Sequence, residues 1–130
     1  MGIHDVIAIG IGCRKACPVA DIVALVEDTV ALLPQGTTPG GLFSLANKRG
    51  EAGLDAAAVA LDLPLTFLDR AALALVAGET NTSSRRVEEM FGLPSVAETA
   101  ALAGAGEGAV LLVPRRASAT TTCAIAGPKP

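Results

Sequence analysis

The chain has 130 residues and is 51% hydrophobic, yet it holds only three Phe and no Tyr or Trp, and its formal net charge is −3. A nucleic-acid-binding surface normally offers aromatic rings for base stacking or a strongly basic face, so a nucleic-acid partner is not expected. No apolar run reaches the ~18 residues of a membrane span, and no signal peptide is recognised. We therefore expect a cytoplasmic protein with one domain over residues 1–130.

The three cysteines, Cys13, Cys17 and Cys123, cannot all pair within one chain, which fits a reducing compartment. Cys13 and Cys17 have three residues between them, and His4 is the only histidine, so the ligand spacing of a zinc site is missing. The chain also has neither a nucleophile-elbow motif nor an HExxH motif. We expect neither a metal nor another cofactor.

The first half of the chain alternates between two hydrophobic periods. Short apolar runs, partly β-branched, predict strands over residues 6–9, 42–46 and 64–68. Between them, apolar residues at helical spacing predict helices over residues 18–33 and 54–61. This alternation is typical of a sheet with helices packed on it.

The second half adds helices and a final pair of strands. Capping residues predict helices over residues 70–77 behind Asp69, over 84–91 from Ser84, and from Ser95 to near Gly104. Two strands, over residues 109–113 and 120–126, are expected to form a hairpin. The whole pattern favours the α/β class, as a single three-layer α/β/α domain with a mixed, mostly parallel sheet of about five strands.

Eight of the ten basic residues form four adjacent pairs, which are Arg14-Lys15, Lys48-Arg49, Arg85-Arg86 and Arg115-Arg116. Three of the pairs follow a predicted strand, and ligands of open α/β sheets bind beyond the carboxyl ends of the strands. One interpretation is ordinary solvated charge beside loops. The other is a rim that binds a small polyanion, and arginine forks suit a polycarboxylate especially well.

Two glycines and two carboxylates each allow two interpretations. Gly10 and Gly12 form either a tight turn that leaves the first strand or backbone N–H groups that hold an anion; a dinucleotide fingerprint is excluded because its third glycine is replaced by Lys15. Glu98 is either a capping-box residue or a catalytic acid. Glu51 is either a first-turn acid of a helix or a general acid–base in the rim.

Several segments, in order along nearly the whole chain, resemble one family. They read GIGCRK at 10–15, Lys48 with EAGL at 51–54, LPLTF at 63–67, GLPSVAETAAL at 92–102 after Ser84 and Val87, and LLVPR at 111–115 with TCAIA at 122–126. The first segment and the SVAE segment are the most specific. The pattern is similar to the CobE / CbiG C-terminal-domain family of cobalamin biosynthesis, and a 130-residue copy resembles its free-standing, CobE-like form.

The resemblance implies a role in converting a precorrin macrocycle into the corrin ring. The implied partner is a precorrin or hydrogenobyrinic-acid-type tetrapyrrole, whose acetate and propionate arms agree with a basic rim, and other cobalamin-pathway enzymes are further implied partners. Longer CbiG-type proteins hydrolyse the ring lactone of cobalt-precorrin-5A. A lactone hydrolase and a non-catalytic docking module are therefore the alternatives to a ligand-binding protein.

The charge pattern and the resemblance together define the expected site. Its ligand-binding residues are Gly10, Gly12, Cys13, Arg14, Lys15, Ser84, Arg85, Ser95 and Arg115. In the hydrolytic alternative, Lys48 polarises the lactone carbonyl while Glu51 or Glu98 handles the proton.

Overall fold

A mixed five-stranded sheet organises the described part of the chain. The computed structural model describes residues 7–69, 71, 96–106 and 108–128. The strands are β1 (Ala8–Cys13), β2 (Gly41–Leu45), β3 (Leu65–Leu68), β4 (Val110–Ala117) and β5 (Thr121–Gly127), in the order β3-β2-β1-β5-β4. β1, β2 and β3 pair in parallel, whereas β5 is antiparallel to both β1 and β4. Four of these strands therefore point the same way, which confirms the mixed, mostly parallel sheet.

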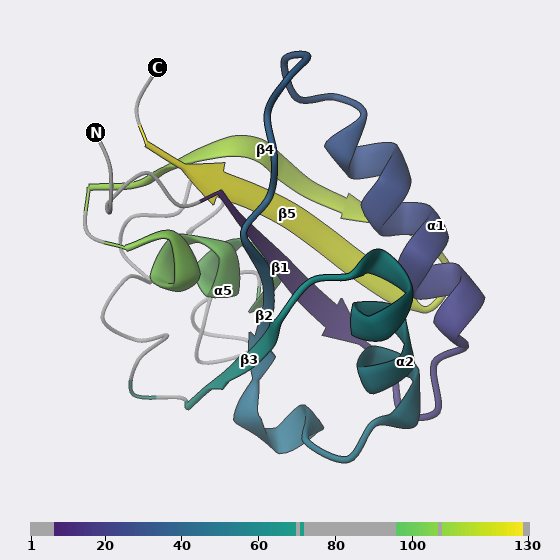
Figure 1. Cartoon of the computed structure of the whole chain (residues 1–130). Coiled ribbons are helices and arrows are strands. Elements are labelled where there is room, and N and C mark those ends of the chain that lie inside the picture. Colours follow the sequence, from purple (N-terminus) through teal and green to yellow (C-terminus); the bar gives the residue numbers. More distant parts are fainter. Residues whose placement is uncertain (1–6, 70, 72–95, 107, 129–130) are drawn as a thin grey trace.

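Helices cover both faces of the sheet (Figure 1). α1 (Val19–Val30) and α2 (Ala52–Leu61) lie side by side on one face, and α5 (Val96–Ala105) lies on the other. A short 3-10 helix, η2 (Ala46–Lys48), leads from β2 to α2. This arrangement confirms the three-layer α/β/α expectation.

The two faces of the sheet have different cores. Toward α1 and α2, the sheet offers branched side chains such as Ile9, Ile11 and Leu42, all fully buried. Toward α5, it offers alanines, among them Ala8 and Ala124. Because alternate residues of a strand point to opposite faces, one sequence specifies both cores. The alanine face lets α5 approach the sheet closely.

Gly10 is the closest point of that approach. A Cβ at this position would overlap the backbone carbonyl of Ala97 and crowd the backbone nitrogen of Ala101, which lies 2.6 Å away. Gly10 and Gly12 both lie inside β1, where Gly10 pairs with Phe43 and with Ala124. The expected glycine turn after the first strand is therefore wrong, since the strand continues through both glycines.

The last strands also run further than expected. β4 extends to Ala117, so Arg115 and Arg116 lie within it and do not follow it. β4 is an edge strand, where Pro114 is tolerated because an outward backbone needs no donor, and its pairing with β5 shifts register between Val113 and Arg116. The antiparallel hairpin of β4 and β5 is confirmed.

The remaining predicted elements have mixed outcomes. The helices expected over residues 70–77 and 84–91 lie outside the described residues, as does Ser95. The predicted helix that follows Ser95 is confirmed by α5. In the described ranges, no helix is long and apolar enough to cross a membrane.

Candidate ligand-binding site at the carboxyl end of the sheet

Three of the four basic pairs fall within the described residues, and all three lie toward the carboxyl end of the sheet. Arg14-Lys15 directly follows β1, and Lys48-Arg49 ends η2 behind β2. Arg116 of β4 is level with Ile11 of β1, because both pair with Cys123. We call these six residues, Arg14, Lys15, Lys48, Arg49, Arg115 and Arg116, the basic rim. Lys48 is half-buried and the other five are exposed.

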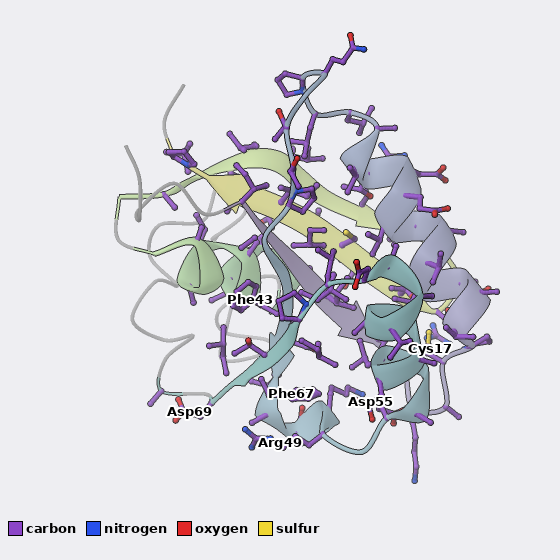
Figure 2. All side chains as sticks on the ribbon, viewed as in Figure 1. Cys17, Phe43, Arg49, Asp55, Phe67 and Asp69 are labelled. Carbon is purple, nitrogen blue, oxygen red and sulfur yellow. The ribbon has the colours of Figure 1, made fainter. Side chains whose placement is uncertain are left out.

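Arg49 is held against an aromatic ring. Its guanidinium carbon lies 5.5 Å from the centre of the Phe67 ring, and Figure 2 shows the two side chains together at the end of β3. A guanidinium over a ring at an exposed site gains about 0.5–1 kcal/mol. This contact restricts where the Arg49 side chain points and leaves its charge in water.

Glu51 joins the loop after β1 to the start of α2. Its Oε1 atom accepts a hydrogen bond of 2.9 Å from the backbone N–H of Ala16. Ala16 has a φ of 62°, a left-handed conformation that costs a residue with a Cβ some energy. The Glu51 carboxylate therefore stabilises the unusual backbone that presents Arg14 and Lys15.

A second set of hydrogen bonds joins the same loop to the β4–β5 turn. The backbone N–H of Arg14 donates to the Thr120 carbonyl at 3.0 Å. The Cys17 thiol donates to Thr120 Oγ1 at 3.2 Å and lies 2.9 Å from Thr121 Oγ1. Thr120 Oγ1 in turn donates to Asp21 Oδ2 at 2.8 Å. The β1–α1 loop is thus hydrogen-bonded to the start of α2 on one side and to the β4–β5 turn on the other.

Glu98 lies beneath the rim and not on its surface. Its side chain is 0% exposed, and its Oε2 accepts a 2.9 Å hydrogen bond from the backbone N–H of Arg115. Glu98 is in the first turn of α5, where an acidic residue interacts favourably with the helix dipole. It therefore connects α5 to β4 at the position of an arginine of the rim.

Cys13, the last residue of β1, is half-buried beside the rim. Burial raises the pKa of its thiol from 9.0 to about 11, even though Lys48 nearby acts to lower it. The thiol is consequently protonated at neutral pH. A thiolate is the nucleophilic form of cysteine, so this environment gives Cys13 no activation.

The acidic residues at this end mostly serve the scaffold. The carboxylates of Asp21, Glu51 and Glu98 each accept a hydrogen bond from the protein, and none of the three is fully exposed. Asp55 and Asp69 are exposed and also lie toward this end (Figure 2). The positive charges of the rim therefore face the solvent more than the negative ones do.

The structure brings together some of the expected site residues but not all. Cys13, Arg14, Lys15, Lys48 and Glu51 cluster at the ends of β1 and β2. Gly10 is covered by α5, and Glu98 is buried. Ser84, Arg85 and Ser95 lie outside the described residues.

Sequence reasoning missed the hydrogen bonds by which Thr120 and Thr121 join the β4–β5 turn to Cys17 and Asp21. The sequence pattern places Thr120 and Thr121 only in a strand, and Asp21 only in a helix. The signal in the sequence was weak: two hydroxyls at the turn of a predicted hairpin give no indication that α1 begins beside them.

The chemistry at this end is electrostatic. Among the residues that the structure describes, no group of three His, Cys, Asp or Glu side chains is placed to hold a metal ion. What the geometry defines is an α/β domain with cations on braced loops at the carboxyl end of a mostly parallel sheet, the place where such folds bind ligands.

The family follows from comparison with known proteins. Residues 7–126 match the family described as "Cobalamin synthesis G C-terminus", and the chain belongs to this family. It is 38% identical over 125 residues to Protein CobE from Sinorhizobium sp, covering 94% of this chain and 80% of the relative. The expected resemblance to CobE is thereby confirmed.

Solved structures agree with this assignment. The crystal structure of CobE, a protein from the cobalamin (vitamin B12) biosynthetic pathway, superimposes with a TM-score of 0.80 at 32% identity, covering 97% of this chain and 96% of the other. The crystal structure of the cobalamin biosynthesis protein chiG from Agrobacterium tumefaciens superimposes with a TM-score of 0.75 at 37% identity, covering 96% of this chain and 100% of the other. The chain is thus a cobalamin biosynthesis protein.

Proposed function

We propose that this chain binds a polycarboxylate tetrapyrrole of the precorrin or hydrogenobyrinic-acid type on the basic rim. The observation that carries the proposal is that exposed cations from three separate segments stand at one end of the sheet. Such a ligand carries acetate and propionate arms around a wide ring. Cations spread over several segments can receive several arms at once, each through charge-assisted hydrogen bonds.

The bracing of the loops supports the proposal. Ordering a flexible side chain or loop on binding costs about 0.5–1.5 kcal/mol per immobilised side chain. Hydrogen bonds from Ala16 to Glu51 and from Arg14 to Thr120 hold the β1–α1 loop in place before a ligand arrives. A rim that is already ordered keeps more of its interaction energy for the ligand.

The positions of the carboxylates favour binding over hydrolysis. A general base must come within hydrogen-bond reach of the reacting group. Glu98 is buried under β4, and Glu51 already accepts the Ala16 N–H. Both residues are thereby engaged in holding the rim, which argues against either of them as the general base of a hydrolase.

The test is a titration of the purified chain with hydrogenobyrinic acid, followed by visible absorbance and native mass spectrometry. The proposal predicts a saturable one-to-one complex in which the ligand keeps its mass. No complex at ~100 μM protein, where even a millimolar-range affinity begins to show, would overturn it. A parallel incubation with a lactone-bearing precorrin distinguishes ligand binding from lactone hydrolysis, because a hydrolase would change the mass of the macrocycle.

A further inference from the structure

The opposite end of the sheet carries a groove. It has a volume of about 450 Å³ and lies where the C-terminal ends of α1 and α2 meet the segment that precedes β2. Its wall is largely apolar, with Val30 from α1, Leu61 and Leu63 from α2 and its exit, and Pro39 from the facing segment. Its polar lining includes two carboxylates, Glu27 and Asp62, both exposed.

The electrostatics of this groove are one-sided. A helix C-terminus carries a partial negative charge and normally takes cations, but the last turns of α1 and α2 hold no basic residue. Glu27 in the last turn of α1 and Asp62 at the C-cap of α2 add full negative charges at those ends. Every basic side chain among the described residues belongs to the basic rim, so none of them neutralises the groove.

We propose that the groove docks a cationic segment of another protein, with apolar side chains in the groove and Lys or Arg side chains on Glu27 and Asp62. Charge complementarity and the shape of the groove support this occupant. The apolar wall favours a segment with apolar side chains over a purely hydrophilic polycation. The two carboxylates beside two helix C-termini favour a cationic segment over a neutral or acidic one. The proposal is independent of the function of the basic rim.

A second copy of this chain fits the groove less well. The cations of a second copy that lie among the described residues all belong to the basic rim, where the Phe67 ring is half-buried beneath Arg49. If the basic rim of one copy docked in the groove of another, it would supply charge but little apolar surface. This docking would also be a head-to-tail contact, which repeats into open chains unless the rotation closes a ring.

The groove and the basic rim lie at opposite ends of the sheet, so both can be occupied at once. The groove lies at the amino end of the parallel strands and the basic rim lies at the carboxyl end. A partner in the groove therefore leaves the rim open. The chain can hold a small anionic ligand at one end while it is attached to another protein at the other.

The first test is a methyl NMR titration of the full chain with a ten-residue peptide of alternating Lys and Leu. We expect saturable shifts at the methyl groups of Val30, Leu61 and Leu63, and none with a peptide that has Glu in place of Lys. The double variant Glu27→Gln, Asp62→Asn should weaken peptide binding about three- to tenfold, the range that two solvent-screened ion pairs supply. Equal affinity of this variant and the wild type would overturn the proposal.

A steric pair of variants completes the test. Ala31→Trp fills the groove from the exposed end of α1, whereas Ala24→Trp adds the same side chain two turns earlier on the same helix, away from the groove. We expect peptide binding to be lost in the first and kept in the second, with similar thermal unfolding of both. Peptide-induced shifts confined to the basic rim, or binding retained in Ala31→Trp, would contradict the proposal. So would self-association of the wild type in sedimentation that Ala31→Trp abolishes.

Discussion

The two ends of the sheet are built from the same elements and have opposite chemistry. Because α1 and α2 run antiparallel to the strands they connect, both helices begin at the basic rim and both end at the groove. The positive ends of their dipoles therefore lie with the rim cations, and the negative ends lie with Glu27 and Asp62. The βαβ topology aligns the backbone field with the side-chain charges at each end.

The two ends also differ in how their loops are held. At the rim, side-chain acceptors add to the backbone hydrogen bond between Arg14 and Thr120: Glu51 accepts the Ala16 N–H, and Asp21 accepts the Thr120 hydroxyl. The loop beside the groove has backbone anchors, among them the hydrogen bond from Gly40 N–H to the Ile7 carbonyl at 2.7 Å. The Glu51 contact fixes the backbone of the loop that carries Arg14 and Lys15, which suits a ligand of fixed shape.

Both ends depend on the sheet that joins them, and Gly10→Ala disturbs the packing of α5 on that sheet. The added methyl group meets the backbone of Ala97, which cannot rotate away, so α5 must shift. We expect a loss of about 3 kcal/mol in the free energy of unfolding, the upper range for overpacking. Urea denaturation measures it, and binding at both ends should weaken together.

Gly12→Ala is the matched control for that change. It lies on the same strand and the same face, but its methyl group meets only the rotatable hydroxyl of Thr122 at 2.6 Å. We expect a loss of less than ~1 kcal/mol. Equal destabilisation by the two variants would show that the α5 contact is not what requires glycine.

Alkaline pH acts on the core between the ends. Burial raises the pKa of Cys123 from 9.0 to about 11, although a hydrogen bond to Thr29 and the nearby Arg116 act to lower it. The unfolded chain loses this proton first, so the stabilisation is fully present below pH 9 and is lost as pH rises toward 11. We expect up to ~2 kcal/mol of pH dependence from this residue, arising only in that range.

The measurement is urea unfolding of the wild type and of Cys123→Ala between pH 8 and 10.5. Removal of the thiol should flatten the decline in stability across this range, whatever constant cost the smaller side chain adds. Parallel curves would mean that Cys123 does not titrate as its burial implies. Rim arginines keep their charge throughout, so ligand binding by them should persist wherever the chain stays folded.

Much of the fold could be predicted from the sequence, because hydrophobic period and turn residues are local signals. Among the described residues, the order of strands and helices, the hairpin and the α/β class followed from them. The limits of β1 and β4 could not be predicted in this way. Gly10 and Gly12 suggest a turn when considered without their tertiary contacts. Only the close packing of the α5 alanines on β1 shows why a glycine occupies the strand. Pro114 likewise predicts the end of a strand from sequence alone, but β4 continues through it because proline is tolerated in an edge strand.

The candidate site was predictable only in its charge. Adjacent basic pairs after strands indicated the end of the sheet at which Arg14 and Lys48 would lie. Spacing could not reveal that Glu51 holds a loop or that Glu98 is buried, since both depend on segments distant in sequence. The groove was not predicted at all, because α1 and α2 must be packed together before their ends form one surface.

Removing charge from one end should leave the other unaffected. We expect Arg14→Ala, Lys15→Ala to weaken hydrogenobyrinic acid binding about tenfold at 10 mM salt and much less at 150 mM, because exposed charges are screened within about 8 Å at the higher value. Isothermal titration at both salt concentrations measures the effect. The control is the Lys-Leu peptide, whose affinity should not change. Unchanged ligand affinity at both salt concentrations would place the ligand elsewhere.

The smallest expected effect separates a positioning role of Glu51 from a catalytic one. Glu51→Ala removes the acceptor of the Ala16 N–H and should cost about 1 kcal/mol of stability or less, since the hydrogen bond is exposed. Glu51→Gln keeps an oxygen acceptor, so its ligand affinity and stability should stay near those of the wild type. If Glu51 instead acts as a general base on a lactone, the Gln variant would lose turnover while binding normally. Amide hydrogen exchange at Ala16, faster in the Ala variant than in the Gln variant, reports the loop contact without any ligand.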